Sequence, residues 1–330
     1  MHGSGLAETL SSGEPSVRAL FEEFVSFGAE ALPLPGRGAT WARFEALATL
    51  SGRDLSAGRL GEGHADAVTI LAEADREPVG GASYGVWAAR RTRGGVVARR
   101  APGGWALDGI QDFCSGATMV DRALLAADAP EGRLLFDVDL AGVVAARHPG
   151  SWPAVGMAGS DSGSLTIGGL VPGSARVGGA DFYTGRRGFW WGAVGVAACW
   201  WGGARALVDG LARTLVADPG PHVAAALGRA VAAVDGAEAV LRLEATRIDD
   251  EAAGRPGPVT AHRRALSVRQ TLHDRCRDVL AHVVDGGGAR LVCLDPGQAR
   301  RTADLYAYLS QHHAGRDAAD LGHLVLGDRA

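Results

Sequence analysis

Hydrophobic positions in the first eighty residues recur at helical spacing. A helix is predicted over Ser16–Leu32, ending at Pro33, because one face collects the apolar residues Val17, Leu20, Phe21, Phe24 and Val25. The same spacing predicts a second helix over Trp41–Leu50. Asp54 is a candidate N-cap for a third helix that runs through Leu71. The chain therefore opens with a helical segment.

From Gly80 the pattern changes to short apolar runs separated by Gly, Pro or Asp, which predicts strands rather than helices. The predicted strands are Ala82–Ala88, Gly95–Ala98, Arg122–Ala127, Arg133–Val138, Gly156–Ala158 and Ser164–Pro172. Another hairpin is predicted at Gly103–Ser115, with a turn at Asp108–Gly109. Strands that follow one another without helices indicate a small antiparallel β barrel or sandwich.

Helical spacing returns in the last part of the chain. Long helices are predicted over Trp190–Leu215, Pro221–Thr246 and Val259–Val284, and a final one begins near Gln298. The third is expected to carry its arginines on its outer faces, namely Arg263, Arg264, Arg269, Arg275 and Arg277. Long helices with short joints form antiparallel bundles. The sequence thus predicts an α+β chain with a helical domain at 1–79, a β domain at 80–184 and a helical bundle at 185–330.

Composition narrows the class of protein further. The 330 residues are 47% hydrophobic, enough for a sizeable core, and the net charge of -4 provides no large basic field for nucleic acid. No Lys occurs, so every basic side chain is Arg, and the four cysteines lack the spacing of a metal site. Without a signal peptide at the start of the chain, we expect a reduced, cytoplasmic location.

One segment raises the question of a membrane span. Residues Gly188–Ala204 carry no charge and have pairs of tryptophans near both ends. The segment is at the short limit of about 17–25 residues for a span, and its glycines weaken it further. A helix that is apolar on all faces also fits the centre of a bundle. We therefore predict a buried core helix and no membrane contact.

The stretch Gly103–Ala117 carries the most specific functional pattern. It reads Gly-Gly-Trp-Ala-Leu-Asp-Gly-Ile-Gln-Asp-Phe-Cys-Ser-Gly-Ala and resembles the flavin-side loop of the acyl-CoA dehydrogenase family. That family has a Gly-Trp-x-Leu-x-Gly-x-Lys hairpin followed by Trp-Ile-Thr, with Gln111 here in place of the Lys. The order of a helical, a β and a helical domain is also that of the family, as are Gly156-Met157 and Val171-Pro172 near the end of the β domain.

The resemblance implies FAD as the cofactor. By matched positions, Phe113, Cys114 and Ser115 stand for the Trp-Ile-Thr that packs beside the isoalloxazine and sends a hydroxyl toward its N5 edge. Val86 and Trp87 lie on the first flavin strand, and Gly287 and Gly288 resemble the Gly-rich turn that approaches FAD from a neighbouring subunit. A plain loop between helices is an alternative interpretation of those glycines. The family likeness further implies a homodimer or homotetramer, or a hetero-oligomer with an active homologue.

The chain also departs from the family at catalytic positions. Trp87 replaces the flavin-contacting Thr, no Gly-Ser-Asp turn follows it, and the usual catalytic Glu is missing from the segment Gln311–Asp317. His312 or His313 is a candidate replacement base, since an imidazole exchanges protons near neutral pH, and Glu244 is an alternative. The His residues equally fit the end of a helix, where the dipole favours them. Adjacent His side chains diverge on a helix, so no metal site is predicted.

His64 belongs to a group of ionisable residues on the third helix. Glu62 and Asp66 share a face at i,i+4 spacing, while His64 points elsewhere. His64 is a candidate proton donor or acceptor for a flavin, or a structural side chain at a domain interface.

Three functions follow from these observations. The first is an FAD-dependent oxidoreductase acting on a small molecule, an acyl-CoA, an acyl-carrier thioester or a similar activated acyl substrate. The second is a flavin-dependent monooxygenase of the same fold, which needs no Glu but needs a hydrogen-bond donor such as Ser115 or His64 near the flavin. The third is a non-catalytic subunit that pairs with an active homologue.

Overall fold

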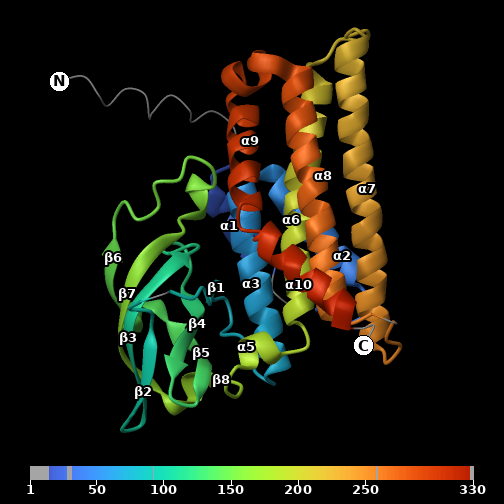
Figure 1. Ribbon diagram of the computed structural model, residues 1–330. Coiled ribbons are helices and arrows are strands. Elements are labelled where there is room, and N and C mark those ends of the chain that lie inside the picture. The colour runs from blue at the N-terminus through green and yellow to red at the C-terminus, as the bar shows by residue number, and fades with distance from the viewer. Residues whose placement is uncertain (1–14, 28–31, 92, 258, 328–330) are drawn as a thin grey trace, which may run out of the picture.

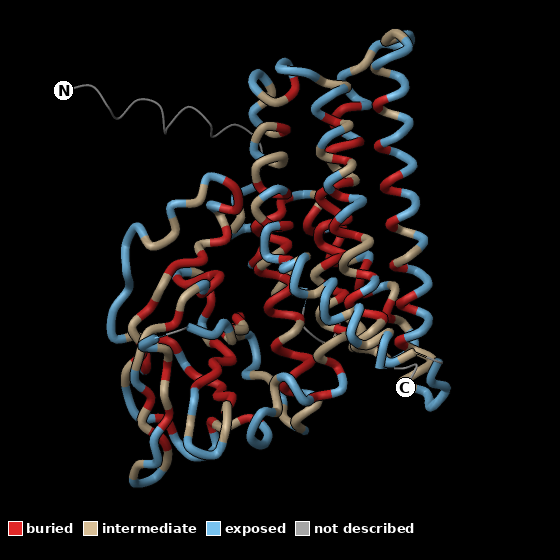
Figure 2. The backbone as a smooth tube through the Cα atoms, viewed as in Figure 1, coloured by how far each residue is buried: buried red, intermediate tan, exposed pale blue. Residues whose placement is uncertain are grey.

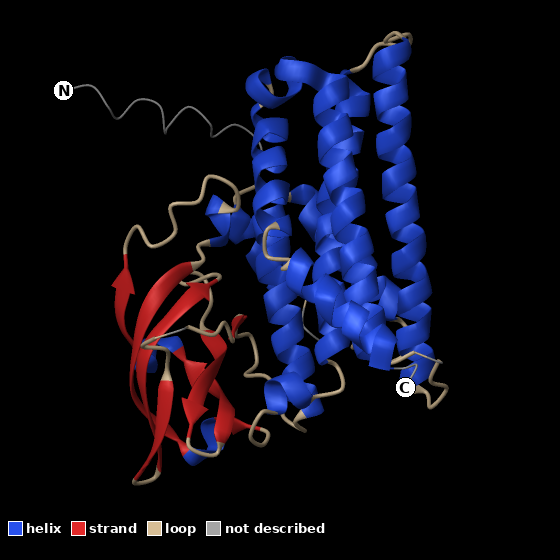
Figure 3. Ribbon diagram, in the orientation of Figure 1, coloured by secondary structure: helices blue, strands red, loops and turns tan. Residues whose placement is uncertain are grey.

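A helical body and a β-sheet lie side by side in this protein, as Figures 1 and 3 show. The structure is a computed structural model that describes residues 15–27, 32–91, 93–257 and 259–327. Helices precede Tyr84 and follow Asp181 in the chain, and the strands lie between them, together with three short helical turns among the described residues. The boundaries at 79/80 and 184/185 stay predictions.

The first helices follow the predicted pattern closely. They are α1 (Val17–Ser26), α2 (Thr40–Arg53) and α3 (Leu55–Glu73). The Asp54 carboxylate caps α3 by accepting the Ala57 N–H at 3.0 Å, which confirms the predicted N-cap. Helix α1 ends at Ser26 rather than at the predicted Leu32, and residues 28–31 of that range lie outside the described residues.

Eight strands form one sheet with the path β6-β7-β3-β2-β4-β5-β8, and β1 pairs with β4 beside this path. The strands are β1 (Tyr84–Trp87), β2 (Val97–Ala101), β3 (Gly104–Cys114), β4 (Arg122–Ala129), β5 (Gly132–Asp139), β6 (Val144–His148), β7 (Gly163–Pro172) and β8 (Arg176–Val177). Most pairs are antiparallel, as predicted, but β1–β4 and β2–β4 are parallel. Because the path of the described strands is open, the sheet is not a clear barrel.

Two local predictions in this region are wrong. Asp108 and Gly109 do not turn the chain, because β3 runs straight through them and pairs there with Gly168 and Ile167 of β7. Gly109 has φ +140°, and a Cβ on it would lie 2.8 Å from the Val96 Cα, so the glycine permits close backbone approach instead.

The predicted strand Gly156–Ala158 is a loop that leads into a 3-10 turn at Ala158–Ser160. The Met157 N–H donates to the Asp304 carboxylate at 2.5 Å, so α9 holds this segment in place of a neighbouring strand.

The remaining helices are α4 (Leu140–Val143), α5 (Phe182–Gly185), α6 (Phe189–Thr214), α7 (Pro221–Ala252), α8 (Ala261–Ala289), α9 (Pro296–Leu309) and α10 (Ala314–Gly327), with a π-helical turn at Arg290–Leu294. Helices α6, α7, α8 and α9 run in alternating directions, which confirms a C-terminal helical bundle (Figure 1).

The core of the helical body is shared between the two ends of the chain. Phe44, Leu47 and Leu55 of α2 and α3 belong to the same buried cluster as Trp200 and Trp201 of α6. Figure 2 shows this buried interior continuing through α6 and α8. The expected core helix is therefore confirmed. Within the described residues, no helix combines the length and the apolar character needed to cross a membrane.

Candidate functional site

Strand β1 presents different side chains to its two sides. Tyr84 packs with Ile70 and Leu71 of α3 in one apolar cluster, and half-buried Val86 packs against the same cluster. Trp87 points to the other side, where it is 1% exposed and packs within the sheet. Because side chains alternate along a strand, Val86 faces the helices and Trp87 faces away from them.

The loop after β3 places its three predicted flavin residues in different surroundings. The Phe113 side chain is 64% exposed and sits at a φ of +58°, unusual for a bulky residue. Cys114 is fully buried, and burial raises the pKa of its thiol well above its ordinary value. Ser115 is nearly buried and its carbonyl oxygen accepts the Trp87 indole N–H at 3.1 Å.

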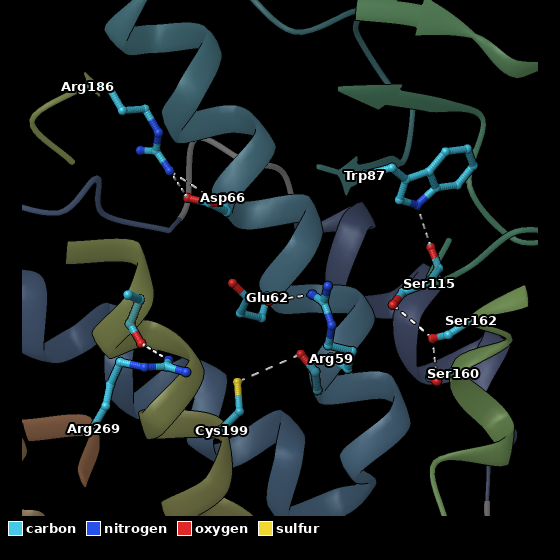
Figure 4. A network of polar contacts seen from close by, with 12 residues as sticks. Arg59, Glu62, Asp66, Trp87, Ser115, Ser160, Ser162, Arg186, Cys199 and Arg269 are labelled. Atoms are coloured by element: carbon cyan, nitrogen blue, oxygen red, sulfur yellow. Dashed lines mark hydrogen bonds and ion pairs between the residues drawn. The ribbon is translucent and has the colours of Figure 1, made fainter. Parts of the chain in front are cut away.

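The Ser115 hydroxyl begins a chain of three serines. Its Oγ lies 2.9 Å from the Ser162 Oγ, which lies 2.9 Å from the Ser160 Oγ (Figure 4). The Ser160 hydroxyl then donates to the Met157 carbonyl at 2.8 Å. Ser115 is therefore joined to Trp87, and its hydroxyl is engaged with the protein.

A cleft of about 360 Å³ lies between β1 and the helices, within the range of roughly 300–1,000 Å³ typical of small-molecule sites. Its walls come from α3, β1, α5, α6, α8, the joint between α9 and α10, and α10 itself. Apolar walls include Val86, Phe189, Trp190, Val196 and Leu266. Charged walls are Arg59, Glu62, Asp66, Arg186, Arg269, Arg316, Asp317 and Asp320. This is the candidate functional site.

Ion pairs line the cleft on its α3 side. The Arg59 guanidinium lies 2.6 Å from the Glu62 carboxylate, one turn along the same helix. Arg186, whose side chain is only 2% exposed, lies 3.0 Å from both Asp66 and Glu73. Figure 4 shows the Glu62 and Asp66 pairs along successive turns of α3.

Two glycines in the first turn of α6 make room for the Arg186 pairs. A Cβ on Gly192 would lie 2.9 Å from the Asp66 Oδ1, and one on Gly188 would collide with the Glu73 carboxylate. The absence of side chains at these positions lets carboxylates of α3 lie directly against α6. The buried Arg186 Nε has no hydrogen-bond partner within the described residues.

Glu62 is the most perturbed acid of the cleft. Burial raises the pKa of its carboxyl above the ordinary value, although the Arg59 charge opposes the shift and Asp66 adds to it. A carboxyl of this kind can hold and release a proton nearer neutral pH than an ordinary Glu, which is the property expected of a general acid or base.

His64 lies on the opposite side of α3 from the cleft. Its Nδ1 accepts the Tyr84 N–H at 3.2 Å, and its ring is 4% exposed. Burial and then the nearby charge of Arg43 lower the pKa of His64 to about 4, so the ring is neutral at pH 7. As expected from helical spacing, Glu62 and Asp66 share a face that His64 does not. The position of His64 favours the structural interpretation.

The joint between α9 and α10 separates its two histidines. His312 is buried against Trp200 with a ring distance of 5.9 Å, and its Nε2 lies 3.0 Å from the Gln270 Oε1. Burial, aided by the charge of Arg269, lowers the pKa of His312 to about 4. His313 is exposed. Gln311 is the residue of this joint that lines the cleft.

The other predicted positions lie apart from the cleft. Gly287 and Gly288 are at the end of α8 remote from α5 and α10 (Figure 1), and they continue the helix rather than form a separate loop, with a break at Gly288. Glu244, the alternative base, is buried on α7 and pairs with Arg264 at 2.9 Å. Within the described residues, no group of His, Cys, Asp and Glu is arranged to hold a metal.

The sequence patterns do not predict that arginines line the cleft. Arg269 was expected on an outer face of α8, but it lines the cleft, and Arg264 is buried between Glu244 and Glu251. Arg186 meets Asp66 across 120 positions of the chain. The local sequence pattern that points to this cleft is the i,i+4 pair Glu62 and Asp66. A short pattern cannot predict which distant helix supplies the arginine that pairs with these acids.

Comparison with known proteins gives matches at the level of structure. XiaF from Streptomyces sp., solved with FADH2 and glycerol, superposes with a TM-score of 0.76 over 93% of this chain and 85% of its own, at 18% identity. Dibenzothiophene monooxygenase TdsC from Paenibacillus sp. A11-2 gives 0.72 over 94% and 95%, at 20% identity. Butyryl-CoA dehydrogenase from Megasphaera elsdenii gives 0.75 over 93% and 89%, at 14% identity.

No family model matches the sequence, and no curated protein matches it. The likeness is therefore one of fold, shared with flavoproteins of both dehydrogenase and monooxygenase activity and extending over nearly the whole chain. The helical body, the sheet beside it and the structural matches together identify the fold of this chain as that of the acyl-CoA dehydrogenases.

Proposed function

We propose that this chain is a flavin-dependent monooxygenase that oxidises a small, largely apolar molecule in the cleft between β1 and the helical body. The observation that carries the proposal is the position of Gln311. The resemblance places the α-proton base of a dehydrogenase in this joint, and the residue that lines the cleft there is an amide, which takes up no proton. Oxygen transfer does not need a base at that point.

Several residues fit a flavin beside this cleft. The exposed Phe113 ring offers an aromatic surface, and the Trp87–Ser115 bond fixes the following loop. Val86 is the part of β1 that reaches the cleft. XiaF is solved with FADH2, and TdsC with FMN and indole, so a flavin is the cofactor we infer, with FAD as the first choice. When bound and reduced, a flavin supplies the electron pair for oxygen chemistry.

Residues of this chain have separate tasks in that reaction. Glu62, whose pKa burial raises, is the carboxyl of the cleft that can take up and release a proton, and Arg59 fixes its position on α3. Phe189, Trp190 and Leu266 surround the substrate with apolar side chains that exclude water. The aromatic lining favours a ring-containing substrate, in keeping with the indole bound by TdsC.

Dehydrogenation of an acyl thioester is the second candidate, since Glu62 is a carboxyl in the cleft that can take up a proton. Against it stand the missing Gly-Ser-Asp turn and the ion pair that holds Glu62 to Arg59.

One experiment separates these functions. The purified protein is titrated with FAD and FMN, oxidised and reduced, and flavin binding is followed by visible absorption. The loaded protein is then mixed anaerobically with butyryl-CoA, and in a second arm reduced flavin is exposed to oxygen with indole present. Oxygenated indole without reduction by butyryl-CoA supports the monooxygenase. Reduction by butyryl-CoA supports the dehydrogenase, and no binding of any flavin supports the non-catalytic subunit.

The proposed function also implies an oligomeric state for this chain. Gly287 and Gly288 lie at the end of the bundle remote from the cleft, so they approach a flavin only if a second chain provides it. We infer a homodimer or homotetramer, with a hetero-oligomer as the alternative, acting in the cytoplasm. Light scattering of the purified chain tests the oligomeric state, and a monomer at micromolar concentration would contradict it.

A further inference from the structure

We propose that Arg269 binds a carboxylate group of the substrate, so that the cleft selects apolar ring compounds that carry an acid. This inference rests on the proposed function, because it names the substrate class of the same cleft. It starts from the position of Arg269 on α8, where its side chain forms part of the cleft wall.

The guanidinium of Arg269 is held in place by neutral groups. Its Nη1 donates to the Ala193 carbonyl at 2.6 Å, and its plane lies over the Trp200 ring, 4.8 Å from the ring centre. Figure 4 shows Arg269 with this bond to α6. Its Nε and Nη2 have no hydrogen-bond partner within the described residues, and the residue lines the cleft. Two donors of one planar group therefore remain for a ligand, the arrangement that matches a carboxylate.

Arg269 also differs from the other arginines of the cleft in its ion pairing. The other cleft arginines each have an acid within 3.1 Å: Glu62 for Arg59, Asp66 for Arg186 and Asp317 for Arg316. Arg269 forms no ion pair with any described residue. Asp320, the remaining acid of the wall, is exposed on α10.

The surroundings of Arg269 disfavour its positive charge when no anion is paired with it. Burial lowers the pKa of Arg269, because a charged guanidinium is disfavoured where water is scarce, and the more distant charges of Asp317 and Glu62 oppose this shift without reversing it. The first turn of α6 contains no acid of its own, and the Asp66 and Glu73 carboxylates of α3 already lie against it, so its positive end is compensated without a ligand. A bound carboxylate would compensate the charge of Arg269. Leu266 and Val196 in the same wall would contact the apolar remainder of the substrate.

The test compares two probes that differ only in charge. Indole-3-carboxylate and indole-3-carboxamide are titrated into the flavin-loaded protein and into the flavin-free protein, and binding is measured by calorimetry. We expect the carboxylate to bind at least about tenfold more tightly than the amide, since charge-assisted hydrogen bonds are the strong ones. Arg269→Gln should abolish this preference, and Arg269→Lys should retain part of it.

Arg275→Gln is the matched control, because Arg275 lies on the same helix, is exposed and pairs with Asp278. It should leave the preference unchanged. Equal or undetectable binding of the two probes to the wild type would overturn the proposal, as would a preference that survives in Arg269→Gln. Loss of FAD affinity in Arg269→Gln with an intact carboxylate preference would assign the guanidinium to the cofactor instead.

The design keeps the two proposals distinguishable. If the protein binds no flavin, the proposed function fails, while the carboxylate preference of the flavin-free protein still decides the role of Arg269. If Arg269→Gln does not fold, as judged by thermal unfolding, the wild-type preference and the Arg269→Lys variant decide it.

Discussion

Replacing Gly202 with Ala tests the contact between α2, in the N-terminal part of the helical body, and α6 of the C-terminal bundle. Helices α2 and α6 cross at this glycine, and a Cβ there would lie 2.6 Å from the Ala48 Cα and closer still to the Ala48 carbonyl oxygen. Carbon atoms normally rest about 3.5–4.0 Å apart, so the helices would have to separate by roughly 1 Å. The obstructing atoms are backbone, and no side-chain rotation relieves the clash.

The expected cost combines two terms of opposite sign. Overpacking a core costs typically about 1–3 kcal/mol, and a backbone clash belongs at the upper end of that range. Alanine in place of glycine returns about 1 kcal/mol of helix propensity. We therefore expect Gly202→Ala to lower the free energy of unfolding by about 2 kcal/mol.

Gly195→Ala is the control, because Gly195 is buried on the same helix but a Cβ there would meet only the Leu47 Cδ1, at 3.7 Å. This is an ordinary contact, so the variant should gain up to about 1 kcal/mol. Urea unfolding followed by circular dichroism measures both midpoints. Equal stability of Gly202→Ala and the wild type, or shifts of the same sign in the two variants, would refute the close crossing of α2 and α6.

Three further predictions concern the site. Ser115→Ala breaks the chain of serine hydroxyls and should slow flavin reduction or reoxidation in stopped-flow measurements; unchanged rates would remove Ser115 from the flavin site. His312 and His313 do not line the cleft, so His312→Asn and His313→Asn should each leave turnover within about tenfold of the wild type; a fall of roughly 100-fold in His312→Asn alone would show that this ring transfers a proton. His64 has a folded pKa of about 4 against about 6.5 unfolded, so the unfolded chain binds the extra proton and stability falls as pH drops from 6.5 toward 4. His64→Gln should therefore flatten the pH dependence of urea unfolding between pH 6.5 and 5, and an unchanged slope would contradict the buried neutral ring.

Periodicity predicts helices such as α1 and α2 well, because apolar residues at helical spacing form their buried face. Helix α2 exceeds its predicted range by one residue at the start and three at the end, and Asp54 caps α3 as expected. The same reasoning failed at Asp108–Gly109, since a turn signal is local and the pairing of β3 with β7 is not. The parallel neighbours of β4 were likewise invisible, because strand order depends on segments far apart in the sequence.

The site was predictable only where it is local. Phe113, Cys114 and Ser115 are consecutive, so a family resemblance could mark them as candidates, but none of the three is among the residues that line the cleft. Gln311 and Arg269, on which the two proposals depend, carry no motif that assigns them to a cleft, and the outward position predicted for Arg269 is wrong. An amphipathic pattern predicts that charged side chains lie on the solvent-exposed face of a helix. Here Arg186 instead lies in buried ion pairs, and Arg269 lies in the wall of the cleft.

Helix α3 explains why the chemistry gathers where it does. A Cβ on Gly58 would lie 2.8 Å from the Ser51 Cα, and one on Gly61 would lie 2.5 Å from the Leu50 Cδ2, so both glycines let α2 pack closely on α3. Each glycine costs about 1 kcal/mol of helix propensity relative to Ala, and this close packing is what offsets it. With α2 on one side and β1 on another, the face carrying Glu62 and Asp66 is left to meet α6. Carboxylates confined there need cations, and the cations come from α3 itself and from the segment before α6. The packing of α3 therefore holds Glu62 and Asp66 against the cleft, where arginines pair with them, and Arg269 is the cleft arginine that forms no ion pair with a described residue.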